Sequence, residues 1–131
     1  MIVVDASTLL EFLLNTDAAP RVAQRLFDSG ETLHAPHLID LEVAQVLRRY
    51  ERAGAVSKPR AKNALEDLDD MVIARYPHNV LLPRVWALRR NVTAYDAVYL
   101  ALAEVLGATL VTRDSALTSV SGHAARVELI R

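Results

Sequence analysis

Residues 93–114, TAYDAVYLALAEVLGATLVTRD, decide the fold class of this chain. From Asp96 to Ala103 the segment is apolar on every face after Asp96 itself, which is typical of a buried helix. This helix is predicted to begin after Thr93, a residue type that caps helices well, and to end at Gly107. The apolar run 108–112 follows at once and predicts a strand. A buried helix therefore leads directly into a buried strand.

The rest of the chain repeats this alternation of strand and helix. The predicted strands cover residues 1–4, 32–35, 71–76, 108–112 and 127–130, and the predicted helices cover 7–14, 19–28, 36–53, 58–71, 79–90 and 94–106. Strands and helices that alternate at this spacing predict a parallel sheet with helices on both faces. We therefore expect one three-layer α/β domain with a mostly parallel central sheet of four or five strands.

Composition restricts the possible function classes. The 131 residues are 52% hydrophobic and 24% charged, as in a single globular domain. The absence of cysteine excludes disulfide scaffolds, thiol catalysis and cysteine-based zinc sites. A net charge of −1 gives no general attraction for nucleic acid. Without a basic N-terminal segment or an apolar stretch near the roughly 18 residues of a membrane span, the chain is expected to be cytoplasmic.

Two acids are predicted to lie at the carboxyl ends of parallel strands. Asp5 follows the first strand directly, and Asp114 comes two residues after the strand 108–112. Ligands of parallel sheets collect at this edge. Aspartate is also common in turns and helix caps after strands, so a structural role for either residue alone stays open.

Two further acids lie on predicted helices. Asp96 is in the first turn of the buried helix, where the helix dipole favours an anion, and a capping box with Thr93 is the structural alternative. Glu42 falls inside an apolar arc, with apolar residues four positions before and after it. Its structural alternative is an ion pair with Arg49. Asp40 is expected at the rim of that helix or in solvent.

Together these four acids predict a cation site. Two carboxylates about 5 Å apart, at an effective dielectric constant of 20, repel each other by about 3 kcal/mol. Four of them at one edge would strain the fold unless a cation joined them. Ligands that are all oxygen suit Mg²⁺ or Mn²⁺ rather than zinc.

Several segments of the chain resemble PIN-domain proteins. They are IVVDAS at 2–7, LEV at 41–43, YDAVYLALA at 95–103 and LVTRD at 110–114. In length and motif spacing the chain is more narrowly similar to the VapC toxins of VapBC toxin–antitoxin pairs. The similarity extends over essentially the whole chain and includes all four acidic positions.

This resemblance implies a single PIN domain over residues 1–131 that acts as a Mg²⁺- or Mn²⁺-dependent endoribonuclease. The matching positions are Asp5 and Asp96 as principal metal ligands, Glu42 and Asp114 as the acids that complete the catalytic site, and Ser7 and Thr112 as its hydroxyl lining. Bound ions of this kind activate a water molecule and stabilise charge on the phosphodiester. A homodimer and a cognate, VapB-like antitoxin are also expected.

A local basic patch predicts contact with RNA in spite of the neutral total charge. Six basic residues lie between positions 48 and 62, against the single acid Glu51. Arg48, Arg49 and Arg52 are the candidate RNA contacts, because arginine recognises phosphate with two parallel hydrogen bonds. A solvated helix face is the alternative interpretation.

The helix 7–14 is apolar on more sides than one sheet can cover, which favours a partner surface. Leu9, Phe12 and Leu13 are the candidate antitoxin contacts, and burial in the core is the alternative. Trp86 lies on an apolar helix face and is predicted to be a core residue rather than a platform for stacking bases.

Other α/β classes fit this sequence less well. A phosphatase of the haloacid dehalogenase type would need an aspartate where Ser7 stands. A response-regulator receiver would need a lysine after a late strand, and the chain has only Lys58 and Lys62. A catalytically inactive PIN-like module that binds RNA or protein is the main alternative, and it would be expected to lack at least one of the four acids.

Overall fold

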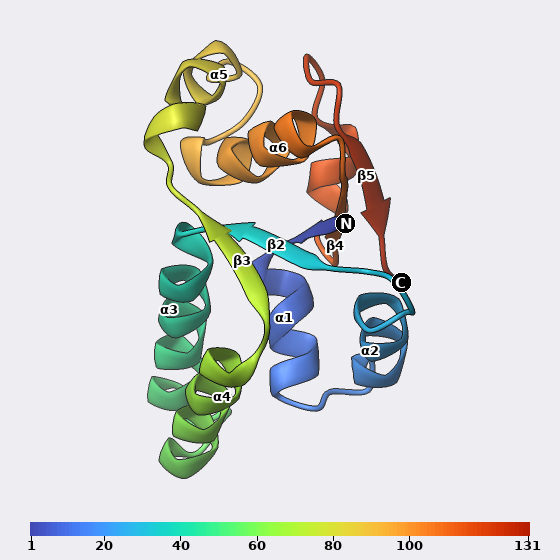
Figure 1. Cartoon of the computed structure of the whole chain (residues 1–131). Helices are drawn as coiled ribbons and strands as arrows, with labels where there is room; N and C mark the ends of the chain where they lie inside the picture. The colour runs from blue at the N-terminus through green and yellow to red at the C-terminus, as the bar shows by residue number, and fades with distance from the viewer.

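A five-stranded, wholly parallel sheet forms the centre of the molecule in a computed structural model that describes all residues, 1–131 (Figure 1). The strands are β1 (Ile2–Val4), β2 (Leu33–Pro36), β3 (Ile73–Tyr76), β4 (Thr109–Thr112) and β5 (Arg126–Leu129). Their order in the sheet is β3-β2-β1-β4-β5, and every pairing is parallel. The expected α/β architecture is confirmed.

Six α-helices and two short 3₁₀ turns connect the strands. They are α1 (Ala6–Leu13), α2 (Ala19–Leu26), α3 (Leu38–Arg52), α4 (Lys58–Asp70), η1 (Asn79–Leu81), α5 (Leu82–Ala87), α6 (Ala94–Leu106) and η2 (Ser115–Ser119). In Figure 1, α5 and α6 lie above the sheet and α1 to α4 lie below it. Helices therefore cover both faces, as predicted. None of these helices has the length and hydrophobicity needed to cross a membrane.

The core joins both helical layers to the sheet. All residues of α6 from Ala97 to Ala103 are buried, as its apolar stretch predicted. Val43 of α3 and Leu110 of β4 have no exposed surface, and both belong to one hydrophobic cluster of 32 buried residues. Because helices pack on both faces of the sheet, the ends of its strands have fixed positions. The residues that directly follow the strands are therefore held in place.

Two local expectations were wrong. Pro36 does not open α3 but ends β2, where it pairs with Tyr76 of β3. Its missing N–H breaks no ladder bond there, because the pairing of β2 with β1 stops at His34. Trp86 is 68% exposed rather than buried, because α5 packs on the core through Val85, and the next residue projects about 100° further round the helix. The guanidinium of Arg89 lies over its ring, 4.7 Å from the centroid.

Candidate active site at the carboxyl edge of the sheet

The four predicted acids come from four segments that converge at the carboxyl edge of the sheet. Asp5 follows β1, Asp114 follows β4, Glu42 lies in the second turn of α3 and Asp96 in the first turn of α6. Burial raises the pKa of Asp96, and the charges of Asp114 and Asp5 raise it further. Burial also raises the pKa of Glu42, and the charges of Asp96 and Asp5 add to this rise. The acids are therefore close enough to interact.

Asp5 is the most buried of these acids, with 6% of its surface exposed. Its Oδ1 accepts hydrogen bonds from the Ser7 hydroxyl (2.7 Å) and the Thr8 backbone N–H (3.0 Å), so Asp5 caps α1. Its Oδ2 accepts from the Thr112 hydroxyl at 2.5 Å. Burial raises the pKa of Asp5, and these donors oppose the rise because they favour the charged form. The carboxylate is thereby held in one orientation.

Ser7 and Thr112 line the site beside Asp5 and connect the ends of β1 and β4. The Ser7 hydroxyl accepts from the backbone N–H of Arg113 at 3.0 Å. The Thr112 hydroxyl accepts from the backbone N–H of Asp114, also at 3.0 Å. The same two hydroxyls therefore orient Asp5 and fix the backbone that carries Asp114.

The carboxylate of Asp96 is half-buried and accepts no hydrogen bond from the chain. Thr93 caps α6 by accepting from the Asp96 backbone N–H at 3.3 Å. In a capping box the acid would bond in return to the backbone N–H of Thr93, and that bond is not formed. The cap explains where the helix begins but not why the residue is an acid. The capping-box alternative is therefore not supported.

Glu42 points toward the other acids, as its helical phase predicted. The hydroxyl of Tyr99 donates to Glu42 Oε1 at 2.5 Å, and the alternative ion pair with Arg49 is not formed. Asp40 instead contacts Arg75 of β3 through two hydrogen bonds of 2.7 and 2.8 Å. Two acids only two residues apart on α3 thus serve different parts of the molecule.

Tyr99 is the site residue that the sequence reasoning missed. It is 2% exposed, and burial together with its bond to Glu42 raises the pKa of its hydroxyl, which stays protonated and donates. The available signal was its spacing from Asp96, because residues three apart share one face of a helix. That spacing does not reveal the partner on α3.

The charge balance of the site fits a divalent cation. None of the four acids takes part in a salt bridge, so their negative charge has no counter-charge within the chain. Carboxylate and hydroxyl oxygens are the donors that Mg²⁺ and Mn²⁺ prefer. As the side chains stand, no three Asp, Glu or His residues are spaced to enclose an ion. An ion would therefore have to draw the carboxylates inward.

The predicted RNA contacts lie away from the sheet edge, on the second half of α3. Arg48, Arg49 and Arg52 are exposed there. Their guanidinium groups make no salt bridge and no hydrogen bond with the rest of the chain. Arg49 lies seven residues after Glu42, so both are on the same face of the helix, about 10 Å apart along its axis.

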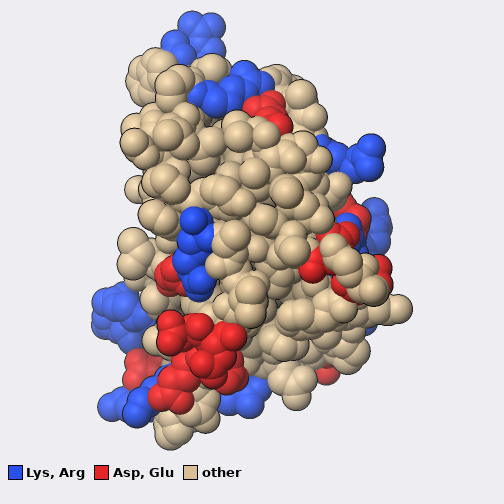
Figure 2. All heavy atoms as spheres, in the orientation of Figure 1, with Lys and Arg blue, Asp and Glu red and all other residues tan.

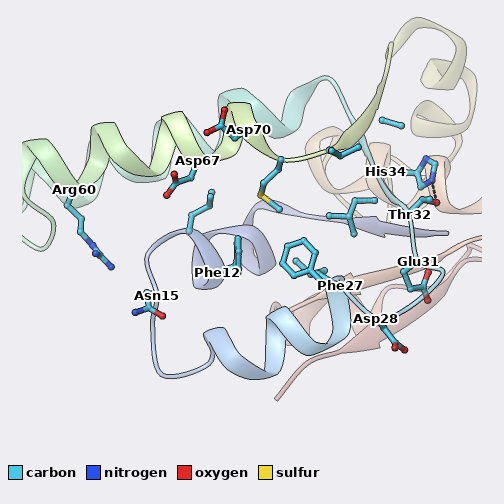
Figure 3. A pocket seen from close by; sticks show the side chains of 16 residues that line it. Phe12, Asn15, Phe27, Asp28, Glu31, Thr32, His34, Arg60, Asp67 and Asp70 are labelled. Atoms are coloured by element: carbon cyan, nitrogen blue, oxygen red, sulfur yellow. Dashed lines mark hydrogen bonds between the residues drawn. The ribbon is translucent and has the colours of Figure 1, made fainter.

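The predicted antitoxin contacts divide into two kinds. Leu9 has no exposed surface and cannot contact a partner, because it lies on the side of α1 that packs into the core. This prediction was wrong. Half-buried Phe12 instead lines a groove of about 1060 Å³, together with Leu13, which is buried with 8% of its surface exposed. In this groove the ring centroids of Phe12 and Phe27 lie 5.0 Å apart, edge to face. Figure 3 shows both rings between α4 and the end of α2.

Comparison with known proteins agrees with this architecture. Residues 2–122 match the family described as PIN domain. The VapC ribonuclease Mb0985 of Mycobacterium bovis is 42% identical over 118 residues, which are 90% of this chain and 89% of that protein. Ribonuclease VapC1 of Mycobacterium tuberculosis is 38% identical over 130 residues, which are 98% of this chain and 97% of that protein.

A solved structure shares the fold at much lower sequence identity. VapBC2 from Rickettsia felis, bound to a DNA fragment from its promoter, superposes with a TM-score of 0.70 at 14% identity, covering 98% of both chains. The family match and the two relatives each extend over at least nine-tenths of the chain. The chain therefore belongs to the PIN-domain family, among the VapC ribonucleases.

Proposed function

We propose that this protein is a metal-dependent endoribonuclease that acts as the toxin of a toxin–antitoxin pair. The observation that carries the proposal is the set of four acids at the sheet edge, which come from four segments and lack any basic partner. The ribonuclease names of relatives at 42% and 38% identity support it. An inactive binding module would not need to keep all four acids at this edge.

Mg²⁺ or Mn²⁺ would be held by Asp5, Glu42, Asp96 and Asp114. When bound, such an ion lowers the pKa of a water molecule and neutralises charge on the scissile phosphate. Asp5 is the preorganised ligand, because three donors already fix its two oxygens. Asp96 has both oxygens free, and Asp114 is exposed at the rim, where RNA would approach.

RNA would follow α3 from the acidic edge toward the basic patch. The acids alone repel a polyanion, so the bound cation and the exposed arginines have to supply the attraction. Arg49 shares the helix face of Glu42, which makes it the first phosphate contact beyond the site. Substitution of Arg49 by Ala is expected to weaken RNA binding at all sequences and to reduce its dependence on salt.

We further propose a cognate, VapB-like antitoxin as the partner of the groove at Phe12 and Leu13. The groove is lined by apolar side chains, by the single arginine Arg60 and by four acids, Asp28, Glu31, Asp67 and Asp70. Glu31 is already paired with Arg25 and the N-terminal amine, so the other three acids carry the available negative charge. Figure 2 shows acidic side chains gathered on the lower part of this face. An amphipathic antitoxin segment with basic residues beside its apolar face would match this surface.

Titration with the protein encoded beside this one tests the antitoxin assignment. Phe12→Ala is expected to weaken binding while RNA cleavage is largely kept. The matched control is Val105→Ala, because Val105 is 70% exposed on α6, outside the groove. Loss of folding in Phe12→Ala would instead mean that Phe12 serves only the core.

A homodimer is the proposed assembly. Val80, Leu82 and Trp86, on η1 and α5, are each more than half exposed and provide apolar surface for self-association. Light scattering after size exclusion measures the mass directly. Trp86→Glu is expected to shift a dimer toward the monomer, and a monomeric unmodified protein would contradict the proposal.

Cleavage of RNA by the purified protein, with Mg²⁺, with Mn²⁺ and with EDTA, is the deciding experiment for the function. Activity is expected with either metal, and EDTA and Asp96→Asn are expected to abolish it. Asp17→Asn is the matched control, since Asp17 is exposed in the turn before α2. Cleavage that survives both EDTA and Asp96→Asn would overturn the proposal.

A further inference from the structure

Helices α3 and α6 carry one acid each to the site, and a single side-chain hydrogen bond joins them. The hydroxyl of Tyr99, on α6, donates to Oε1 of Glu42, on α3, at 2.5 Å. No other side-chain hydrogen bond or salt bridge connects these two helices. The position of the Glu42 carboxylate relative to α6 therefore depends on this contact.

The contact leaves the two oxygens of Glu42 in different situations. Oε1 is occupied by Tyr99, whereas Oε2 accepts no hydrogen bond from the chain. Asp96 and Asp5 lie near enough to repel the Glu42 carboxylate. Without a donor on one oxygen, this repulsion would turn the flexible side chain outward into solvent, where its rotamer freedom is greater.

The place of Tyr99 in α6 also separates it from an ordinary core tyrosine. Asp96 and Tyr99 are three residues apart, so both project from the same face of α6 toward the sheet edge. The Tyr99 ring is fully packed, with 2% of the residue exposed, and its hydroxyl bonds only to the acid of the site. The packed ring thus supplies a rigid donor.

We infer that Tyr99 is a positioning residue, whose hydroxyl holds Oε1 of Glu42 so that Oε2 faces the metal position. This inference rests on the proposed function and deepens it. Hydrogen-bonding partners of metal ligands fix ligand orientation, and their loss typically costs about 10- to 100-fold in metal affinity or activity.

Tyr99→Phe tests the inference, because it removes the hydroxyl and keeps the buried ring. Mn²⁺ binding is titrated by electron paramagnetic resonance without RNA, and cleavage kinetics are measured separately. Mn²⁺ affinity is expected to fall about tenfold, and kcat at limiting metal by a similar factor, while KM for RNA stays within about twofold. Tyr95→Phe, at an exposed tyrosine of the same helix, is the matched control.

A double-mutant comparison shows whether Tyr99 acts through Glu42. In a Glu42→Gln background, Tyr99→Phe is expected to change Mn²⁺ affinity by less than about twofold, because the ligand it positions is already lost. Equal losses in both backgrounds would overturn the inference. So would a Tyr99→Phe variant that lowers the melting temperature equally with and without Mn²⁺ and keeps its Mn²⁺ affinity.

A second variant and the unmodified protein distinguish failure of this inference from misfolding and from failure of the proposed function. Tyr99→Met also lacks the hydroxyl, and it repeats the test in a different packing background if the phenylalanine variant folds poorly. An unchanged Tyr99→Phe variant of an active protein overturns this inference alone. Failure of the unmodified protein to bind Mn²⁺ and to cleave RNA would overturn the proposed function together with it.

Discussion

The two ends of α6 carry carboxylates in opposite environments. Near its C-terminus, Glu104 accepts two hydrogen bonds from Arg84, at 2.8 and 2.9 Å, and one from the Ala124 backbone N–H at 2.7 Å. The bond from Arg84 holds the pKa of Glu104 below its usual value. In its first turn, Asp96 accepts no bond from the chain, and burial and neighbouring acids raise its pKa.

The helix dipole alone does not account for this difference. An anion is favoured at the N-terminus of a helix and disfavoured at the C-terminus, so Glu104 needs Arg84 to offset its position. Asp96 has the favourable end, yet three other acids are gathered around it. Glu104, whose oxygens are paired, supports the structure, whereas Asp96, whose oxygens have no partner in the chain, belongs to the candidate binding site.

The largest effect is expected from removal of one acidic charge at the sheet edge, either at the N-terminal end of α6 or directly after β1. Asp96→Asn, or Asp5→Asn, should reduce RNA cleavage by more than about a hundredfold, because loss of a ligand exceeds the loss of an orienting partner. Initial rates at saturating Mg²⁺ measure this, with circular dichroism to confirm folding. A cleavage rate near that of the unmodified protein would remove the distinction between the two ends of α6.

A similar comparison on α3 is expected to give the next largest effect. Glu42→Gln keeps size and hydrogen bonding but loses charge, and it should cut activity at least tenfold, about 1.4 kcal/mol of barrier. Asp40→Asn weakens only the contact with Arg75 and should leave turnover within a few-fold. If the two substitutions reduced the cleavage rate equally, the orientation of Glu42 toward the other acids would not explain its role in cleavage.

Removal of the carboxylate charge at the two ends of α6 should change the melting temperature in opposite directions. In EDTA, Asp96→Asn is expected to raise the melting temperature, because it relieves repulsion at the sheet edge. Glu104→Gln should lower the melting temperature slightly, because it breaks the ion pair with Arg84, and a partly solvated ion pair contributes little to stability. Calorimetry in EDTA and in excess Mn²⁺ measures the melting temperatures of the two variants. Excess Mn²⁺ should cancel the rise in melting temperature that Asp96→Asn gives in EDTA.

The same measurement has an outcome that would restore the structural interpretation of Asp96. If Asp96→Asn lowers the melting temperature in EDTA, the carboxylate serves the helix cap with Thr93 after all. The site would then consist of three acids rather than four.

The pH dependence of stability is expected to be the smallest effect. Asp5, Glu42 and Asp96 have pKa values above their usual 3.8 to 4.5, so the folded state binds protons more tightly than the unfolded state. Metal-free protein should therefore gain stability as the pH falls from 7 toward about 5. Below the usual value of 4.5, Glu104 loses its stabilising charge and reverses this trend.

Melting curves at stepped pH in EDTA check this behaviour. Asp96→Asn should flatten the rise, and excess Mg²⁺ should remove it by favouring the charged forms. A metal-free protein whose stability falls steadily from pH 7 to pH 5 would contradict the raised pKa values.

Features coded by local periodicity could be predicted from the sequence. The apolar helix after Asp96 and the strand that follows it were recognised from composition, and the phase of α3 separated Glu42 from Asp40. Strand ends placed Asp5 and Asp114 at one edge, because parallel strands share their carboxyl side.

Features that depend on distant partners could not be predicted. The bond from Tyr99 to Glu42 spans 57 residues, and the contact between Arg75 and Asp40 spans 35. The burial of Leu9 and the exposure of Trp86 depend on how α1 and α5 pack, which no single helical pattern specifies. Tertiary packing decides these contacts, and a pattern within one element does not contain it.

The strand order also determines at what point of synthesis on the ribosome the four acids can come together. β1 is translated first, but its neighbour β4 is translated near the end, and the bond from Thr112 to Asp5 closes a separation of 107 residues. Contacts this distant in sequence raise the contact order of a fold, and a high contact order is associated with slow folding. A nascent chain therefore holds Asp5 without Asp96 and Asp114 through most of its translation, so the four acids can come together only when the chain is nearly complete.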